Sequence, residues 1–489
     1  MDFFYSEKKE ECGVIAIYSK KGEDVAPFLY NALVALQHRG QDAAGMVILA
    51  PPSPASGTQH PVPGDIHNPK PGTRNTEPGA GNRELVARRG LGLVTDIFGD
   101  ADMKAKGHIG IGHTRYPTTG RCLMQDVQPS VIGDIALAHN GHLANYDAVR
   151  ASLEKSGYSF TGTVDSEPIA FLLHSRLKGG ATIEEAVRHA IAALDGSYSD
   201  VAIIGGRLAA FRDPHAIRPL VWGENDRFIS FASESCALDA NGIPCMGSVE
   251  GGELVVLGSA MERKTILKKD TKNCMFEYVY FSRPDSVING KEVLETRKKL
   301  GAQLAIEHPA QADIVVPVPD TSRPAAEAYA RALGLPCEEG LIKNRYIGRT
   351  FIMPTQEKRA SNVRLKLNPV RSVVSGKRIA LIDDSIVRGT TLKKIVSLLR
   401  EAGASQVHVR ITSPPIRHPC FYGVDMKSYG ELAAHGKSVR EIAAFLGADS
   451  LGYLSMEGLK GAIGLPLCTA CLDGSYATPA ALASALKNR

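Results

Sequence analysis

Short apolar runs separated by amphipathic segments mark the first half of the chain. A helix is predicted at residues 28–37, because Leu29, Leu33 and Leu36 recur at helical spacing on one face. Strands are predicted at residues 14–18, 110–114, 135–139 and 201–204. This half therefore alternates short β-rich runs with helical segments.

After about residue 270 the pattern changes to repeated strand–loop–helix units. The helix between the last two strands has apolar residues at i, i+3, i+4 and i+7, namely Leu392, Ile395, Val396 and Leu399, and ends at Gly403. Another helix runs from Pro324 to Gly334. Strands are predicted at residues 314–318, 378–382 and 407–412. Repeated βαβ units predict a parallel sheet that binds ligands at the carboxyl ends of its strands.

The segment 51–83 interrupts the pattern of the first half. Eight of its 33 residues are Pro and five are Gly, a share typical of low-complexity sequence. We interpret it as a mobile surface insertion between two strands, because exposed loops accept insertions at low cost.

Composition narrows the possible functions. The 489 residues are 44% hydrophobic and 22% charged, as in globular proteins, with a net charge of +5. Without a block of basic residues, nucleic-acid binding is not expected, and without an apolar run of about 18 residues, neither is a membrane span. Residues 1–11 lack the apolar core of a signal peptide, so we expect a cytoplasmic protein. Nine cysteines, an odd number, favour thiol or metal chemistry over a disulfide scaffold.

Residues 382–391, IDDSIVRGTT, form the most specific motif, between a predicted strand and a predicted helix. The loop can hold a phosphate through its backbone N–H groups at the helix N-terminus, and Gly389 permits close approach. Two adjacent carboxylates, Asp383 and Asp384, would repel that phosphate unless they bind hydroxyl groups or Mg²⁺. The ligand is therefore expected to carry a phosphate and a diol. The alternative is an ordinary turn with an Asp cap.

This motif resembles the phosphoribosyl-pyrophosphate signature of the type I phosphoribosyltransferases. The resemblance implies that the acidic pair faces the ribose hydroxyls and one Mg²⁺ per subunit, with Thr321 near the metal. Residues 343–351, KNRYIGRTF, resemble the family's flexible lid, which closes over departing pyrophosphate. The implied substrate-binding residues are Asp383, Asp384, Ser385, Ile386, Val387, Arg388, Gly389, Thr390, Lys343 and Arg349.

Cys12 opens the first predicted strand directly after the charged leader. A cysteine at a strand start is usually a small buried hydrophobe. If residues 1–11 were removed, however, Cys12 would carry a free α-amine. The pKa of such an amine, roughly 7.7–8.0, suits a base for the adjacent thiol.

Further motifs resemble the N-terminal-nucleophile class of glutamine amidotransferases. They are residues 37–42 (QHRGQD), 112–118 (GHTRYPT), 139–141 (HNG) and 162–167 (GTVDSE). The resemblance implies that Cys12 attacks the glutamine carboxamide while Asn140 and the Gly141 N–H stabilise the oxyanion. It also implies that Arg115 pairs with the α-carboxylate of glutamine and Asp165 with its α-ammonium. The implied glutamine-binding set is Arg115, Tyr116, Thr118 and Asp165.

A glutaminase domain followed by a phosphoribosyltransferase domain resembles the amidophosphoribosyltransferase family. The implied α/β architecture is an α+β αββα sandwich followed by a parallel-sheet domain. The implied segments are a propeptide at 1–11, an amidotransferase domain at 12–270 with the insertion 51–83, and a phosphoribosyltransferase domain at 271–480 with a C-terminal iron–sulfur segment. The implied reaction converts glutamine, 5-phosphoribosyl 1-pyrophosphate and water to 5-phosphoribosylamine, glutamate and pyrophosphate, the first committed step of purine synthesis. Feedback-inhibiting purine nucleotides and a homodimer or homotetramer are also implied.

Cys468 and Cys471 form a C-x-x-C pair, which alone is compatible with redox chemistry, zinc or no function. The resemblance adds Cys274 and Cys420, and implies that in one branch of the family these four hold one [4Fe–4S] cluster per subunit. Four thiolates also suit zinc, which is the alternative. A cluster here is expected to be structural, clamping the domain junction to the C-terminal tail. The remaining cysteines, Cys122, Cys236, Cys245 and Cys337, are expected to be buried thiols.

Two other functions compete with this interpretation. A glutamine-dependent transferase that makes an amino sugar phosphate would share the front half, but the Asp383–Asp384 loop argues against it. A non-catalytic, nucleotide-sensing paralogue would not need an intact Cys12 and Asn140. Ala216 stands where the family more usually has Gly, and we expect little effect unless that backbone needs a positive φ.

Overall fold

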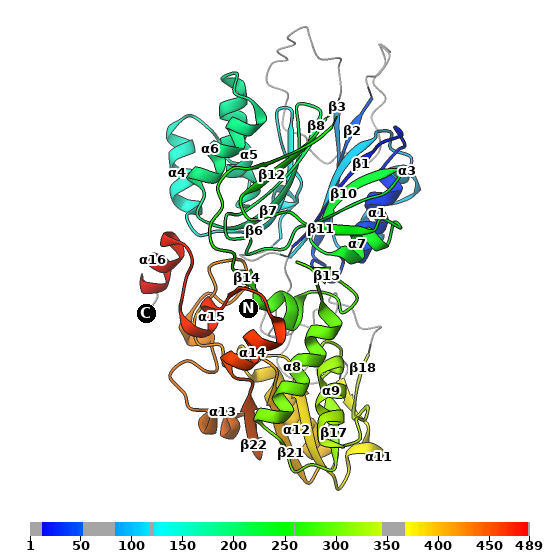
Figure 1. Ribbon diagram of the computed structural model, residues 1–489, viewed down its shortest axis with the longest axis vertical. Coiled ribbons are helices and arrows are strands. Elements are labelled where there is room, and N and C mark those ends of the chain that lie inside the picture. Colours follow the sequence, from blue (N-terminus) through cyan, green and yellow to red (C-terminus); the bar gives the residue numbers. More distant parts are fainter. Residues whose placement is uncertain (1–11, 52–83, 117–121, 259, 345–366, 488–489) are drawn as a thin grey trace.

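The computed structural model describes residues 12–51, 84–116, 122–258, 260–344 and 367–487. The predicted propeptide and nearly all of the predicted insertion lie outside the described residues, as do two predicted site residues, Thr118 and Arg349. The described chain forms two assemblies, which are the upper and lower parts of Figure 1.

Two antiparallel sheets form the N-terminal half. The first has the strand order β11-β9-β10-β1-β4-β2-β3, with β1 (Gly13–Ser19), β2 (Ala43–Ala50), β3 (Glu84–Leu91), β4 (Ile109–Arg115), β9 (Val221–Glu224), β10 (Phe228–Ala232) and β11 (Cys245–Ser248). The second has the order β13-β12-β8-β7-β6-β5, with β5 (Ser130–Ile132), β6 (Ile135–Leu143), β7 (Gly196–Ile204), β8 (Arg207–Arg212), β12 (Glu253–Leu257) and β13 (Met261–Thr265).

Alternation along the strands explains how these sheets pack. In β1, Val14 and Ala16 contact the core between the two sheets, whereas Ile15 and Ile17 pack under the helices of the first sheet. The outer face of the first sheet carries α1 (Ala26–Ala35), α2 (Val94–Ile97), α3 (Asp100–Met103) and α7 (Ser235–Asp239). The outer face of the second carries α4 (Tyr146–Lys155), α5 (Ser166–Lys178) and α6 (Ile183–Ala193). The result is an αββα sandwich (Figure 1).

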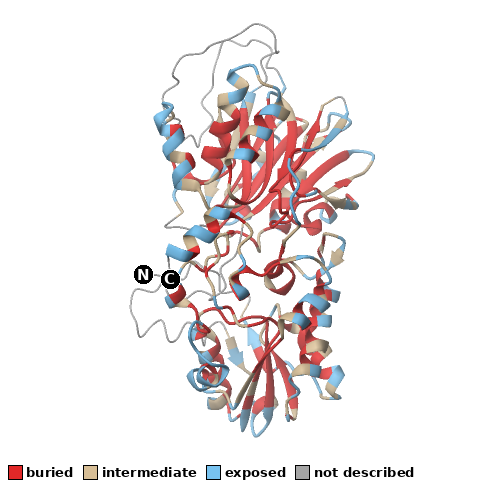
Figure 2. Cartoon of the chain, turned by 60° about the vertical axis from the view of Figure 1, so that its left-hand side comes forward, coloured by how far each residue is buried: buried red, intermediate tan, exposed pale blue. Residues whose placement is uncertain are grey.

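A four-stranded parallel sheet forms the core of the C-terminal half. Its order is β17-β20-β21-β22, with β17 (Ile314–Pro317), β20 (Arg378–Asp383), β21 (Gln406–Ile411) and β22 (Ser450–Tyr453). One face packs on α8 (Val293–Glu307), α9 (Arg323–Leu333) and α14 (Met456–Ile463). The other packs on α11 (Arg371–Val374), α12 (Thr390–Glu401) and α13 (Val439–Leu446). Figure 2 shows the buried residues concentrated in the strands of both halves.

The C-terminal segment returns to the junction between the two halves. β14 (Asn273–Cys274) pairs in parallel with β23 (Leu467–Cys468), so the start of the second half is hydrogen-bonded to its end. At α16 (Pro479–Lys487), the Ala480 N–H donates to the Asp195 carboxylate of the first half over 3.0 Å. The smaller elements are β15 (Val287–Ile288), β16 (Lys291–Glu292), β18 (Leu341–Lys343), β19 (Leu367–Pro369), α15 (Ala470–Asp473), the π-helical turn η2 (Glu277–Phe281), and the 3₁₀ turns η1 (Met124–Asp126) and η3 (Tyr429–Glu431).

The predicted fold class is confirmed, with each predicted strand and helix present and its ends shifted by a few residues. The helix from Pro324 ends at Gly334 as predicted, and this glycine has a left-handed backbone with φ +66°. Strands β2 and β3 pair with Ala50 opposite Glu84, so the segment 51–83 joins two strands of one hairpin. Within the described chain, no helix is long and apolar enough to cross a bilayer.

Candidate active sites

Cys12 stands at the N-terminal end of β1, where the two sheets approach each other. Its thiol donates to the Tyr116 carbonyl, with 3.7 Å between Sγ and O. Its own carbonyl accepts a hydrogen bond of 2.9 Å from Nε of the buried Arg39. Strand pairing places Gly13 opposite Thr114, so the end of β4 that carries Arg115 lies beside the nucleophile.

Asn140 and Gly141 lie on β6 of the second sheet. The Ser233 hydroxyl joins this strand to β1, because it accepts from the Val14 N–H of β1 at 3.0 Å and from Nδ2 of Asn140 at 3.3 Å. A Cβ on Gly141 would stand 2.0 Å from the Ser197 carbonyl oxygen of β7, so only glycine fits. The structure therefore brings the three predicted catalytic residues to one end of the sandwich.

Asp165 precedes α5 and faces two imidazoles. Its Oδ2 accepts from the Leu143 N–H at 2.7 Å, and lies 3.3 Å from Nδ1 of His142 and 3.9 Å from Nε2 of His139. Burial by itself raises the pKa of Asp165, but the two imidazoles outweigh burial and hold that pKa below its usual value. Asp165 is therefore a carboxylate near neutral pH, as a partner for an ammonium group must be.

A buried polar layer underlies this site. His139 donates from Nδ1 to Asp200 at 2.7 Å, and its carbonyl accepts from Nε2 of His113 at 3.1 Å. Burial lowers the pKa of His113 well below its usual value, so this imidazole is neutral. The buried Nε of Arg115 has no hydrogen-bond partner among the described residues, which leaves a donor for an incoming carboxylate.

The loop after β20 forms the second site. Asp383 ends the strand, and its Oδ1 accepts from the Asp384 N–H at 2.9 Å and from the Ser322 hydroxyl at 3.2 Å. Asp384 accepts from the Thr321 hydroxyl at 2.6 Å and from the Ser385 hydroxyl at 2.9 Å. The loops after β17 and β20 therefore meet at the carboxyl edge of the parallel sheet, as predicted for its ligand site.

The rest of the loop leads into α12. Gly389 is the N-cap of this helix and has φ +78°, a conformation that favours glycine. Ile386 and Val387 are buried beneath the loop, whereas Arg388 is ion-paired with Glu431 of η3. Thr390 begins the helix, so its N-terminal dipole faces the loop.

Lys343 on β18 reaches the loop after β17. Its Nζ lies 3.0 Å from Oδ2 of Asp320, one residue before Thr321. The structure thus brings this predicted lid residue to the rim of the second site. The rest of the predicted lid from residue 345 onward, including Arg349, lies outside the described residues.

Cys274, Cys468 and Cys471 lie in three short elements at the junction, whereas Cys420 lies in the loop between β21 and η3. β14 and β23 align Cys274 with Cys468, and Cys471 lies in α15. Burial raises the pKa of Cys468 to about 12, and raises that of Cys471 together with the three neighbouring sulfurs. Forming thiolates here requires a strong positive charge close by, which a metal centre provides. The four are not set around a common point, since no three His, Cys, Asp or Glu of the described chain form a group that could hold one metal ion.

The other cysteines differ in their exposure. Cys236 is buried, and Cys122 and Cys245 are half-buried. The expectation of a buried thiol is wrong for Cys337, which is exposed. This residue forms an isolated bridge with Val315 beyond the outer edge of the parallel sheet, where no further strand of the described chain covers it.

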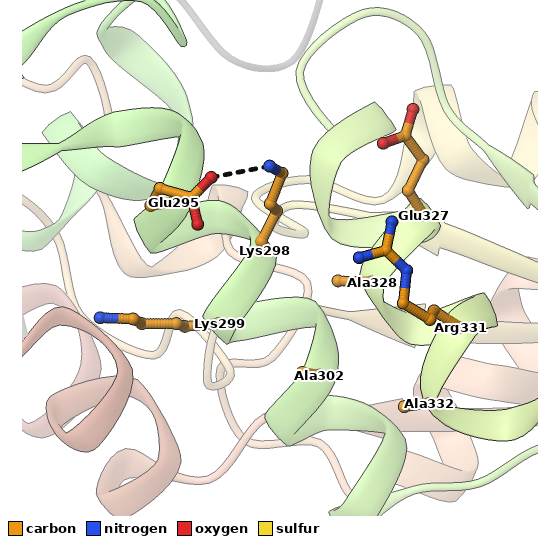
Figure 3. A pocket seen from close by; sticks show the side chains of 8 residues that line it. All are labelled: Glu295, Lys298, Lys299, Ala302, Glu327, Ala328, Arg331 and Ala332. Atoms are coloured by element: carbon orange, nitrogen blue, oxygen red, sulfur yellow. Dashed lines mark hydrogen bonds and ion pairs between the residues drawn. The ribbon is translucent and has the colours of Figure 1, made fainter.

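A groove of about 340 Å³ lies elsewhere, between α8 and α9 (Figure 3). Alanines form its floor and charged side chains its rim, including the Glu295–Lys298 pair at 2.7 Å. None of the residues that line it belongs to either predicted site. The chemistry described above therefore lies outside this groove.

Several polar residues at these sites were not predicted. Asp200 stands among apolar and small residues on β7, and Ser233 directly follows β10, so neither carries a local sequence signal. Arg39 does stand within the QHRGQD motif at residues 37–42, but the motif alone gives it no role. Glu234 and Glu277 accept hydrogen bonds from the Arg39 guanidinium, and both lie more than 190 residues away from it in sequence.

Comparisons with known proteins identify both halves. Residues 114–240 match the model of the glutamine amidotransferase domain, and residues 289–413 that of the phosphoribosyl transferase domain. The amidophosphoribosyltransferase of Methanothermobacter thermautotrophicus is 44% identical over 97% of this chain and 96% of its own length. That of Bacillus subtilis is 41% identical over 96% and 94%.

Solved structures agree with this along nearly the full chain. The B. subtilis glutamine phosphoribosylpyrophosphate amidotransferase, complexed with ADP and GMP, has a TM-score of 0.83 at 40% identity, covering 96% of this chain and 98% of the other. A solved structure of the allosteric regulatory enzyme of purine biosynthesis has a TM-score of 0.84 at 39% identity, covering 97% of this chain and 99% of the other.

Proposed function

The chain belongs to the amidophosphoribosyltransferase family, and from that premise we propose how its residues carry out the reaction. It is a glutamine-dependent phosphoribosyltransferase that converts glutamine, 5-phosphoribosyl 1-pyrophosphate and water to 5-phosphoribosylamine, glutamate and pyrophosphate. This is the first committed step of purine synthesis. Neither an enzyme of amino-sugar synthesis nor a non-catalytic paralogue is supported by these relatives.

In the N-terminal half, Cys12 is the nucleophile. Its sulfur attacks the carboxamide carbon of glutamine, and the Asn140 side chain with the Gly141 N–H stabilises the oxyanion. Arg115 pairs with the α-carboxylate, and the ionised Asp165 with the α-ammonium. Collapse of the tetrahedral adduct releases ammonia and leaves a thioester at Cys12, which water hydrolyses to glutamate.

In the C-terminal half, the loop after β20 binds the 5-phosphate of the ribose. Its N–H groups and the N-terminus of α12 favour that anion, while Asp383 and Asp384 orient the ribose hydroxyls. The same carboxylates stabilise positive charge that develops at C1 as pyrophosphate departs. The positive charges of Lys343 and Arg349 stabilise the departing pyrophosphate. Ammonia attacks C1, and because it is protonated in bulk water, its route between the sites excludes water.

One Mg²⁺ per subunit fits the second site. Carboxylate and hydroxyl oxygens are the ligands this ion prefers. The buried Asp383 and Asp384 and the half-buried Thr321 supply them, and hydrogen bonds join Thr321 to Asp384 and Asp384 to Asp383. Bound Mg²⁺ would neutralise charge on pyrophosphate as it leaves.

One [4Fe–4S] cluster per subunit fits the four cysteines. All four ligands are sulfur, and each thiolate of such a cluster binds a different iron, so the sulfurs need not converge on one point. Zinc, by contrast, needs four sulfurs within about 2.3 Å of a single centre. Bound here, the cluster would clamp β14 to β23 and α15. The protein purified with its cluster should be brown, and bleaching by oxygen should lower both its unfolding temperature and its activity.

The leader segment, nucleotide inhibition and oligomeric state are the remaining parts of the proposed function. Residues 1–11 are removed to give Cys12 a free α-amine, and mass spectrometry of active protein that finds Met1 at the amino terminus would contradict this. Purine nucleotides inhibit the enzyme, which the ADP and GMP named for the B. subtilis structure support. The protein is a cytoplasmic homodimer or homotetramer.

The observation that carries the function is the presence of both sites in one chain, with β1 joined to Asn140 through Ser233 and Asp384 joined to Thr321. The test is Mg²⁺-dependent release of pyrophosphate from 5-phosphoribosyl 1-pyrophosphate, with either glutamine or ammonium chloride as the nitrogen source. Both sources should support release. If neither glutamine nor ammonium chloride supports pyrophosphate release, the proposal is wrong.

A further inference from the structure

A buried ion pair crosses the junction between the two halves. Arg39 follows α1 in the glutaminase half, and Glu277 begins η2 in the phosphoribosyltransferase half. Two parallel hydrogen bonds of 2.9 Å join Nη1 and Nη2 of the guanidinium to the two carboxylate oxygens. Their side chains are 0% and 3% exposed, so water screens this pair little.

The other edge of the same guanidinium holds the nucleophile. Nε of Arg39 donates to the carbonyl oxygen of Cys12 at 2.9 Å. A second carboxylate, Glu234, accepts from Nη1 at 2.6 Å and fixes the plane of the group. One planar side chain therefore connects the main chain of Cys12 to a carboxylate of the opposite half.

Glu277 is itself held by its own half. The Ser282 hydroxyl donates to its Oε2 at 2.8 Å. The carbonyl groups of Tyr278, Tyr280 and Ser282 accept from Arg297 of α8 at 3.0, 2.9 and 2.8 Å. The turn η2 thus has a fixed geometry set by α8, and Glu277 projects from it toward Arg39.

We propose that Glu277 is a positioning residue for glutamine hydrolysis, contributed by the phosphoribosyltransferase half and acting on Cys12 through Arg39. This rests on the proposed function. Glu277 holds the plane of Arg39, and Arg39 holds the main chain of the nucleophile through the Cys12 carbonyl.

The test compares nitrogen sources in the full-length holoenzyme carrying Glu277→Gln, which keeps the side-chain volume and one acceptor. Pyrophosphate release is measured with glutamine and with ammonium chloride. Because about 1 Å of misplacement can cost about 100-fold in rate, we expect kcat with glutamine to fall roughly 10- to 100-fold with little change in the KM for glutamine. The ammonia-dependent rate should stay within about twofold.

Glu253→Gln is the matched control, because it breaks a partly buried pair with Arg263 (2.7 Å) on β12 and β13. It should change neither rate. If the glutamine-dependent kcat of Glu277→Gln falls less than about threefold, or if both rates fall together, the proposal is wrong. If that variant does not fold, Ser282→Ala, which removes only a donor to Glu277, decides by the same criterion, with an expected loss of about fivefold with glutamine alone. Wild-type protein that releases no pyrophosphate with ammonia would instead overturn the proposed function.

Discussion

The two candidate sites of this molecule are assembled in opposite ways. The phosphoribosyl site is local, because most of its residues lie in one loop after β20. This loop stands at the carboxyl edge of the parallel sheet, where ligands of such sheets bind. The glutaminase site is dispersed, because Cys12, Asn140 and Asp165 come from different parts of the chain. Buried side chains such as Ser233 and Arg39 hold these parts in place. A local site tolerates change in the surrounding fold, whereas a dispersed site depends on it.

The sharpest way to separate the two sites is Cys12→Ala. Removing the nucleophile should lower glutamine-dependent pyrophosphate release at least about 1,000-fold, because no thioester can form. The ammonia-dependent rate should stay within about twofold, because the loop after β20 is untouched. The exposed thiol provides the control, and Cys337→Ala should leave both rates unchanged. Equal loss with both nitrogen sources would show that the sites are not separable.

The converse experiment is Asp384→Asn. Here both nitrogen sources should become about 100-fold less effective, since the side chain serves C1 chemistry and the metal rather than glutamine. Steady-state pyrophosphate release measures this, with Asp313→Asn, an exposed carboxylate paired with Arg378, as the control. If only the glutamine-dependent rate falls, Asp384 does not act in the phosphoribosyl reaction as proposed.

Asp165→Asn tests the dispersed site through binding. Loss of the charge opposite the α-ammonium should raise the KM for glutamine about 10- to 100-fold, with ammonia-dependent kinetics unchanged. Because His142 and His139 hold the pKa of Asp165 below its usual value of 3.8, the carboxylate stays ionised at all higher pH. Titration of Asp165 itself should therefore not change the KM for glutamine between about pH 5 and pH 8. A KM of the Asp165→Asn variant within about threefold of the wild-type value would contradict the assignment.

The smallest effect is expected at Ala216, where the backbone has φ +54°. Replacement by Gly relieves about 1–2 kcal/mol of left-handed strain. It also gives up about 0.8 kcal/mol of methyl burial and about 0.5–1 kcal/mol of unfolded-state entropy. Ala216→Gly should thus change the free energy of unfolding by less than about 1 kcal/mol, whereas the β-branched Ala216→Val should cost more than about 2 kcal/mol. Denaturant unfolding curves measure both.

The same contrast explains what could be predicted from the sequence. The spacing of apolar residues predicted the strands and helices that form the layers. The contiguous IDDSIVRGTT motif at residues 382–391 predicted a phosphate- and diol-binding loop directly. The partners that hold the dispersed site carried no such signal, since Glu277 lies 238 residues from Arg39 and pairing across the junction follows only from the tertiary fold. The exposure of Cys337 was missed for a similar reason: it depends on β17 being an edge strand.

The central claim is that one chain transfers the amide nitrogen of glutamine to the phosphoribosyl group. Its most direct test is the stoichiometry of glutamate and pyrophosphate formed by the holoenzyme with Mg²⁺ and both substrates. The account predicts equal amounts of the two products at every time point. Glutamate formed without pyrophosphate would contradict it.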